Sequence, residues 1–154
     1  MTPTRLRTLA ATALAAGLVA YVLFRWRYSS LPPVPLTAAV STGGLAVAEL
    51  FLAPGTRARL DGRPGTKPIL PMSVARIAAL AKASSALGAL MAGVWLGIGA
   101  YVLPRWDLAS PRRDTIRAAV GLASALLLVV AALRLENVCR VPPPPTEAEP
   151  GRQR

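Results

Sequence analysis

The sequence has few of the residues from which catalytic and metal sites are usually built. It contains no histidine and only one cysteine, Cys139. A disulfide within the chain is therefore impossible, and the cysteine and histidine spacings of zinc and haem sites do not occur. Charged residues are also scarce, at 16% of the chain, against about 25% in a typical soluble domain. We accordingly expect no catalytic, cofactor-binding or metal site, and we do not expect an enzyme.

Long apolar runs are the main feature that the sequence does have. Apolar residues make up 53% of the 154-residue chain, and its mean hydropathy is +0.45. Three runs contain no charged residue at all, and they comprise residues 8–24, 83–104 and 118–133. Since a helix rises about 1.5 Å per residue, about 17–25 apolar residues cross the hydrocarbon core of a bilayer. The runs therefore predict helices that span a membrane and have the lipid bilayer as a partner.

These runs, together with one weaker run, predict an all-α integral membrane four-helix bundle of up-down topology. The weaker run is the second along the chain, and it contains Gly43, Gly44 and the acid Glu49. The third helix should start near residue 72, so that its first turns lie in the headgroup region. The four expected spans cover about residues 8–24, 36–53, 83–102 and 117–135.

The two ends of the chain differ from the spans. The first run could be a secretory signal peptide, but the bulky and charged Arg25-Trp26-Arg27-Tyr28 that follows it suits a membrane interface better than a cleavage site. We therefore favour an uncleaved helix. Proline fills positions 142 to 145, and we expect residues 142–154 to form a disordered cytoplasmic tail after a membrane domain of residues 1–141.

Basic residues at the ends of the spans predict the orientation. Ten lie on the side of the two termini, namely Arg5, Arg7, Arg57, Arg59, Arg63, Lys67, Arg76, Lys82, Arg134 and Arg140. Six lie on the opposite side, namely Arg25, Arg27, Arg105, Arg112, Arg113 and Arg117. Under the positive-inside rule the excess places both termini in the cytoplasm, with the protein in the plasma membrane. The net charge of +11 is explained in this way, and no nucleic-acid partner is expected because no basic stripe interleaves with aromatic residues.

Aromatic residues predict which helix ends share a leaflet. Trp26 and Tyr28 lie at the end of the first expected helix, and Tyr101 and Trp106 lie at the end of the third. Tryptophan and tyrosine prefer the membrane interface. We therefore expect these two helix ends on the same side of the bilayer.

Small residues recur at every fourth position of the third expected helix. This ridge consists of Ala81, Ser85, Ala89, Gly93 and Gly97. Shorter matching ridges occur in the first helix, at Ala13 and Gly17, and in the fourth, at Gly121 and Ala125. Small residues at this spacing let helix backbones approach closely in a membrane. The ridge predicts either packing within the bundle or a docking face for a second copy or another membrane protein.

Charged residues gather near the side of the termini. Glu49, Arg76, Lys82 and Glu136 all map to that leaflet, and charges near a membrane tend to pair and to mark functional sites. Glu49 with Lys82 or Arg76 is the expected pair, although each side chain could instead reach the headgroups independently. Ser84 and Ser85 lie close to Lys82, but without an oxyanion site they do not predict a serine–lysine hydrolase.

Three stretches resemble a known family. They are Pro3-Thr4-Arg5-Leu6-Arg7, then Arg76-x3-Leu80-Ala81-Lys82-Ala83-Ser84-Ser85-x2-Gly88-Ala89, and finally Leu135-Glu136-x2-Cys139-Arg140-x-Pro142. With them the chain resembles an uncharacterised actinobacterial membrane-protein family, domain of unknown function 3180. The family is similar in size, has four predicted spans and has no established activity. The resemblance implies a site on the cytoplasmic face, with candidate residues Arg76, Lys82, Ser84, Ser85, Glu136, Cys139 and Arg140.

The sequence leaves the function open. Our leading hypothesis is a non-enzymatic membrane scaffold or accessory protein that docks a partner through the small-residue face or the basic loop of residues 54–71. The alternative is a small homo-oligomeric transporter or channel with Glu49 as its ionisable element. The lack of acids in the middle of any span counts against this alternative. Cys139 lies beside Arg140, which could lower the pKa of its thiol, but we expect this lone thiol on the cytoplasmic side to be inert.

Overall fold

Four long helices form the protein. The computed structural model describes residues 6–28, 36–60, 71–105 and 107–139. Helices α1 (Leu6–Arg27), α2 (Leu36–Leu60), α3 (Pro71–Val102) and α4 (Ala109–Val138) account for nearly all of them, with a short 3₁₀ helix, η2 (Leu103–Arg105), after α3. No strand occurs in these residues, and the prediction of an all-α four-helix bundle is confirmed. The expected tail, residues 142–154, lies outside the described residues.

The helices extend furthest beyond the expected spans at the end of α2 and at the start of α4. We expected the second span to end at about residue 53, before Pro54 and Gly55, but α2 continues through Pro54 to Leu60. Proline removes one intrahelical hydrogen bond and strains the preceding turn, yet the buried Thr56 keeps the following turn packed. Helix α4 begins at Ala109 with Pro111 in its first turn, where a missing N–H costs little because the first N–H groups have no intrahelical acceptor.

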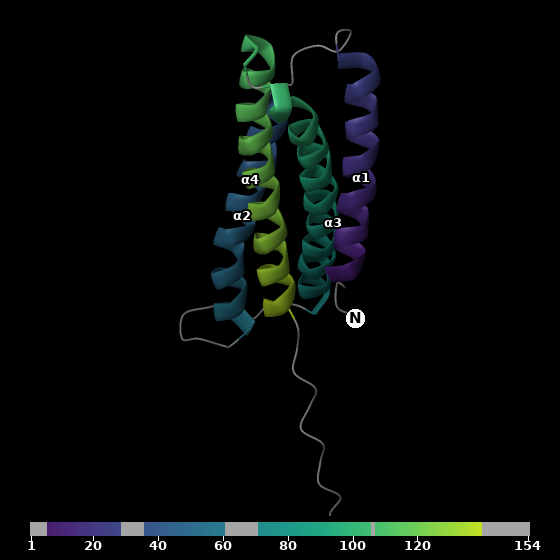
Figure 1. Ribbon diagram of the computed structural model, residues 1–154. Coiled ribbons are helices and arrows are strands. Elements are labelled where there is room, and N and C mark those ends of the chain that lie inside the picture. Colours follow the sequence, from purple (N-terminus) through teal and green to yellow (C-terminus); the bar gives the residue numbers. More distant parts are fainter. Residues whose placement is uncertain (1–5, 29–35, 61–70, 106, 140–154) are drawn as a thin grey trace, which may run out of the picture.

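The helices alternate in direction, as Figure 1 shows. The first turn of α1, the last turn of α2, the first turn of α3 and the last turn of α4 lie at one end of the bundle. The opposite ends of the four helices lie together at the other end. Helices α1 and α3 therefore run in parallel, as do α2 and α4, and the up-down arrangement agrees with the prediction.

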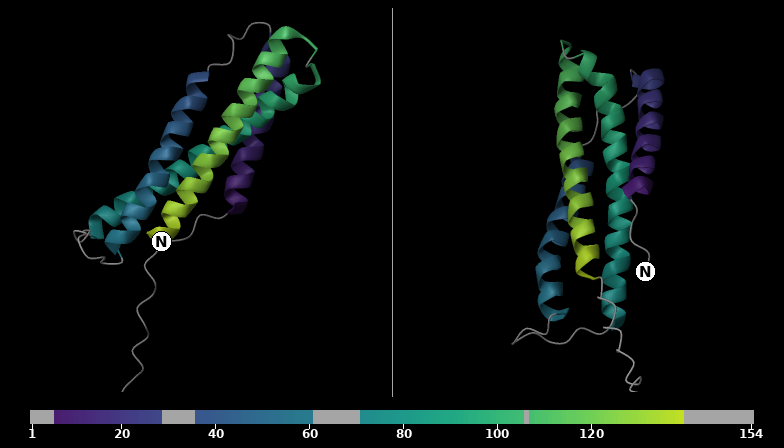
Figure 2. Two further views of the ribbon diagram at one scale, coloured as in Figure 1. Left: turned by 90° about the vertical axis from the view of Figure 1, so that its left-hand side faces the viewer. Right: turned by 60° about the horizontal axis from the view of Figure 1, so that its bottom comes forward.

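The helices do not pack in the order of the chain. Helix α3 packs against both α1 and α4, and α4 packs against α2. Helices α1 and α2 lie on opposite sides of the α3–α4 pair, as both views in Figure 2 show. The connection between residues 28 and 36 therefore joins the two outermost helices. The spatial order is α1, α3, α4, α2.

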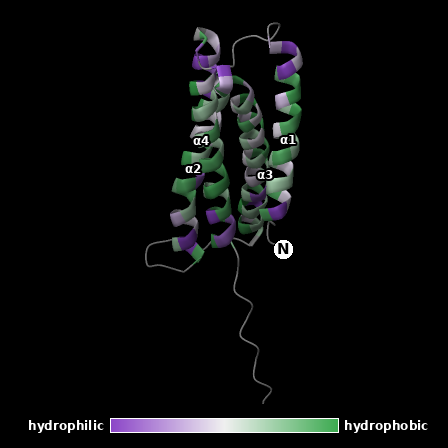
Figure 3. Cartoon of the chain, viewed as in Figure 1, coloured by the Kyte–Doolittle hydropathy of each residue, from purple (hydrophilic) through white to green (hydrophobic). Residues whose placement is uncertain are grey.

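The outer surface of the bundle is apolar over the middle of every helix. All four helices are long and apolar enough to cross a membrane. Large apolar side chains such as Leu14, Leu18 and Phe51 are exposed, and hydrophilic residues gather at the two ends of the bundle (Figure 3). Helices that are apolar all round must be covered by lipid or by other protein. The chain is a multi-pass membrane protein.

Candidate functional site

The central part of the small-residue ridge forms the contact between α1 and α3. A Cβ atom on Gly93 would clash with the backbone carbonyl of Ala13, and one on Gly97 would clash with the carbonyl of Gly17. A Cβ atom on Gly17 would in turn lie 3.0 Å from the carbonyl oxygen of Gly93. The two backbones are thus in direct contact, which only glycine allows here. The ridge is used within the bundle at this level and is not free to dock a partner.

The rest of the ridge is also in the interior. Ala81 and Ser85 are fully buried and Ala89 is 4% exposed. Ala81 packs in an apolar cluster with Ala53 of α2 and Leu135 of α4. The first part of the ridge therefore faces away from α1 and toward the other two helices.

Helices α3 and α4 meet through the indole ring of Trp95. A Cβ atom on Gly121 would overlap the six-membered ring of Trp95, so this glycine makes room for the ring. One on Gly88 would lie 2.8 Å from Val129 Cγ2 and 3.2 Å from the carbonyl oxygen of Ala125. The Gly121 and Ala125 ridge expected on the fourth helix is therefore at the α3–α4 interface.

Glu49 is the most unusual residue of the interior. It lies on α2 with no exposed surface. Within the described residues neither carboxyl oxygen of Glu49 has a hydrogen-bond partner. The hydroxyl of Ser84, itself buried on α3, is close enough to act on this carboxyl, but not in hydrogen-bonding geometry. A buried polar group without a partner is rare and requires an explanation.

The positive charges expected beside Glu49 point elsewhere. Arg76 and Lys82 are exposed, and neither is joined to Glu49 by a hydrogen bond or an ion pair. Successive helical residues are rotated by about 100°, so Lys82 and Ser84, two positions apart, lie on nearly opposite faces of α3. Because Ser84 faces Glu49, Lys82 cannot. The expected pair of Glu49 with Lys82 or Arg76 does not form.

The remaining candidates near this end do not converge on one site. Glu136 is buried near the end of α4 and takes part in an interaction of its own, while Arg140 lies outside the described residues. The Ser85 hydroxyl donates a hydrogen bond to the backbone carbonyl of Lys82, at 2.9 Å, and not to its amine. Burial raises the pKa of the half-buried Cys139 thiol, which is the opposite of the shift that Arg140 was expected to cause.

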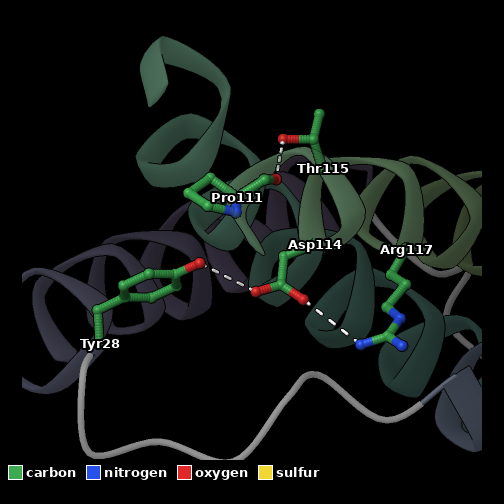
Figure 4. A network of polar contacts seen from close by, with 5 residues as sticks. All are labelled: Tyr28, Pro111, Asp114, Thr115 and Arg117. Carbon is green, nitrogen blue, oxygen red and sulfur yellow. Dashed lines mark hydrogen bonds and ion pairs between the residues drawn. The ribbon is translucent and has the colours of Figure 1, made fainter. Parts of the chain in front are cut away.

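The opposite end of the bundle carries a polar network that the sequence analysis missed. The Tyr28 hydroxyl donates a hydrogen bond of 3.1 Å to Asp114 Oδ2, and Arg117 Nη1 lies 3.5 Å from Asp114 Oδ1 (Figure 4). Asp114 is 8% exposed. Burial, and then the hydrogen bond to Asp114, raises the pKa of Tyr28. The sequence signal that could have indicated this network is Asp114 itself, because it lies near the start of the fourth helix, where the helix dipole stabilises negative charge.

Aromatic rings surround this network. Tyr28, directly after α1, and Phe24 of α1 both contact Tyr101 of α3, with ring centroids 5.3 Å and 6.4 Å away. The Arg105 guanidinium lies over the Tyr101 ring, 4.2 Å from its centroid. The ends of α1 and α3 therefore lie together, as their aromatic residues led us to expect. Trp106 lies outside the described residues.

A long apolar groove follows the outer helix α1. Its volume is about 710 Å³, and Leu90 and Val94 form its α3 side. The α1 side is lined by Thr12, Ala15, Ala16, Val19, Ala20, Leu23, Phe24 and Arg27. Four of these eight side chains are alanine or threonine, so a chain in the groove could approach the α1 backbone closely.

Comparison with known proteins gives one result. A family model described as a protein of unknown function, DUF3180, matches residues 9–143. No curated protein and no solved structure matches the chain. The match covers all four helices and stops within the proline run.

Proposed function

The chain belongs to the DUF3180 family of proteins of unknown function, and we propose that it is a non-enzymatic accessory protein of the plasma membrane. In this proposal it binds a transmembrane helix of a partner protein in the groove along α1. Both termini and the basic residues near them face the cytoplasm. The open groove is the observation that carries the proposal.

The position of α1 supports docking at the groove. Helix α1 packs against α3 and lies at the edge of the bundle. Gly93 and Gly97 of the α3 ridge already contact α1. We therefore place the docking site in the groove along α1 and not on the ridge.

The length of the groove favours a helix over a lipid chain. Its α1 lining runs from Thr12 to Arg27, which corresponds to about 22 Å along a helix. One leaflet contributes only about 15 Å of hydrocarbon. A groove that exceeds one leaflet and is rich in small side chains suits a membrane-spanning helix.

Cysteine crosslinking in native membranes tests the proposal. In a Cys139→Ser background, Ala16→Cys places a thiol in the groove, whereas Leu18→Cys places one on an exposed part of α1 outside the groove lining. We expect a crosslink to a different protein from Ala16→Cys and none from Leu18→Cys. Equal crosslinking from both positions, or none from either, would contradict docking in the groove.

A homo-oligomeric transporter or channel is the second candidate, and the buried Glu49 favours it. Four helices enclose little space, so a pathway would need two or more copies. A crosslink of twice the chain mass from Ala16→Cys would support this candidate over an accessory protein. Glu49→Gln should then abolish flux in proteoliposomes, and unchanged flux would remove Glu49 from the mechanism.

A further inference from the structure

We propose that Glu49 holds a proton inside the membrane and that the space between α2, α3 and α4 around it is a proton-binding site. This inference goes beyond the docking function and does not depend on it. It rests on where the carboxyl lies, on what surrounds it and on which charges are kept away from it.

The carboxyl lies between three helices at a defined level. On α2 and α4, which run in parallel, Gly43 lies beside Ser124 and Ala53 packs with Leu135. This register places Glu49 beside the segment of α4 from Leu128 to Ala132, where Leu128, Ala131 and Ala132 have no exposed surface. The side of the site formed by α4 is therefore apolar.

No positive charge faces the carboxyl from these helices. On α3, Arg76 and Lys82 are exposed, and Lys82 lies on the face opposite to Ser84. On α4, Arg134 is exposed and Glu136 would add only negative charge. On α2 itself, Arg57 is exposed and lies two turns further along the helix. Among the described residues, an ionised carboxylate at this position would thus have no adjacent counter-charge.

A proton removes this problem. An isolated carboxylate in an apolar interior is far more costly to bury than a neutral acid, and such groups take up a proton instead. A neutral carboxyl needs only one acceptor for its O–H, and the Ser84 oxygen lies close to it. The Ser84 hydroxyl is therefore a candidate acceptor for the acid proton.

Two buried hydroxyl groups lie on the same side of α2 as Glu49. Thr42 and Thr56 lie seven residues before and after Glu49, and residues seven apart share a helix face. Both threonines are buried, at 8% and 5% exposure. The Thr42 hydroxyl donates a hydrogen bond to the Ala38 carbonyl, at 2.7 Å. Thr56 is the buried hydroxyl between Glu49 and the basic end of α2.

A lipid-soluble carbodiimide tests the site on the full-length protein in native membranes. Dicyclohexylcarbodiimide reacts with protonated carboxyls: the acid proton moves to a carbodiimide nitrogen, a carboxyl oxygen bonds to the central carbon, and rearrangement gives a stable acylurea. At neutral pH we expect the adduct on the peptide that contains Glu49 and its loss in Glu49→Gln. Glu136→Gln serves as the matched control and should leave the adduct in place. Protection of Glu49 by sodium or potassium ions would show a cation site and overturn the proposal.

Infrared spectroscopy tests the protonation of Glu49 even if the reagent cannot enter the space between α2, α3 and α4. The difference spectrum of the unmodified protein and Glu49→Gln at neutral pH should contain the carbonyl stretch of a protonated acid, and the band should shift in heavy water. This band supports the proposal whether or not the adduct forms. Carboxylate bands in its place would overturn the proposal, whatever the labelling result.

Discussion

Tyr28 and Asp114 are the residues through which the first helix meets the last. Helix α1 packs mainly against α3, so the hydrogen bond from Tyr28 to Asp114 is a link to α4 at the end of the bundle. Asp114 also forms an ion pair with Arg117, at 3.5 Å, so its two carboxylate oxygens contact one partner each. This small network holds the edge helix in register with the core pair.

Replacing Tyr28 with phenylalanine should loosen this link without disturbing the rings. The substitution removes one hydrogen bond to a charged acceptor, which is typically worth about 1.5–3 kcal/mol when buried and less in this partly open position. We expect a loss of about 1 kcal/mol in the free energy of unfolding, measured by denaturation in detergent. Tyr21→Phe is the control, because Tyr21 makes a similar ring contact with Tyr101. Equal losses in both variants would contradict a specific role for the Tyr28 hydroxyl.

The same tyrosine predicts how stability responds to alkaline pH. Burial and the hydrogen bond to Asp114 raise the pKa of Tyr28 above its ordinary value of 10.0. Because the folded state favours the neutral phenol, its contribution to stability is complete below pH 10 and is lost as the pH rises through the folded-state pKa. An absorbance titration of tyrosinate should therefore show one tyrosine that ionises late, and Tyr28→Phe should remove it. A difference titration with an ordinary midpoint would contradict the prediction.

At the scale of the helices, the contact between α1 and α3 depends on glycine. Gly93 and Gly97 face the backbone carbonyls of Ala13 and Gly17, with no room for a Cβ atom. Gly44 on α2 has no atom within 4 Å of the corresponding position. The two kinds of glycine are alike in sequence and different in environment, which makes a matched comparison possible.

Gly93→Ala should separate α1 from α3. Overpacking of a tight contact costs about 1–3 kcal/mol, which exceeds the gain of up to about 1 kcal/mol that alanine brings to a helix. We expect a lower unfolding temperature in detergent and faster proteolysis of α1. Gly44→Ala should leave the unfolding temperature unchanged or raise it. The prediction is wrong if Gly93→Ala is as stable as the original protein.

The existence of the helices could be predicted from the sequence, but their neighbours could not. Charged residues are costly to place in lipid, so membrane spans appear in the sequence as long uncharged runs. The ridge of Gly93 and Gly97 indicates a close contact but does not name its partner, since Gly17 and Gly121 offer similar ridges. The expected pairing of Glu49 with Lys82 or Arg76 was wrong for a similar reason. Which charge lies near it depends on how α2 and α3 are rotated, and an apolar helix has no polar face that fixes this rotation.

At the scale of the whole molecule, the packing order and the directions of the helices do not determine the orientation in the membrane. Either end of the bundle could face the cytoplasm. The bundle is apolar over its middle and hydrophilic at both ends (Figure 3), so this pattern alone does not decide. We predict that charge decides, because ten basic residues lie on the side of the termini and six on the other side. Four of the ten lie close together in the sequence, between residues 57 and 67, namely Arg57, Arg59, Arg63 and Lys67.

Neutralising these four residues should make the orientation mixed. Replacing Arg57, Arg59, Arg63 and Lys67 with glutamine lowers the count on that side from ten to six, equal to the other side, and the positive-inside rule then has no preference. Reporters that act in only one compartment, fused to either terminus, should give a cytoplasmic signal in the original protein and signals from both compartments in the variant. The control neutralises Arg105, Arg112, Arg113 and Arg117, which increases the bias and should leave both termini in the cytoplasm. If the four-residue variant keeps a single orientation, these four charges do not set it, and the signal must come from the first helix and its flanks.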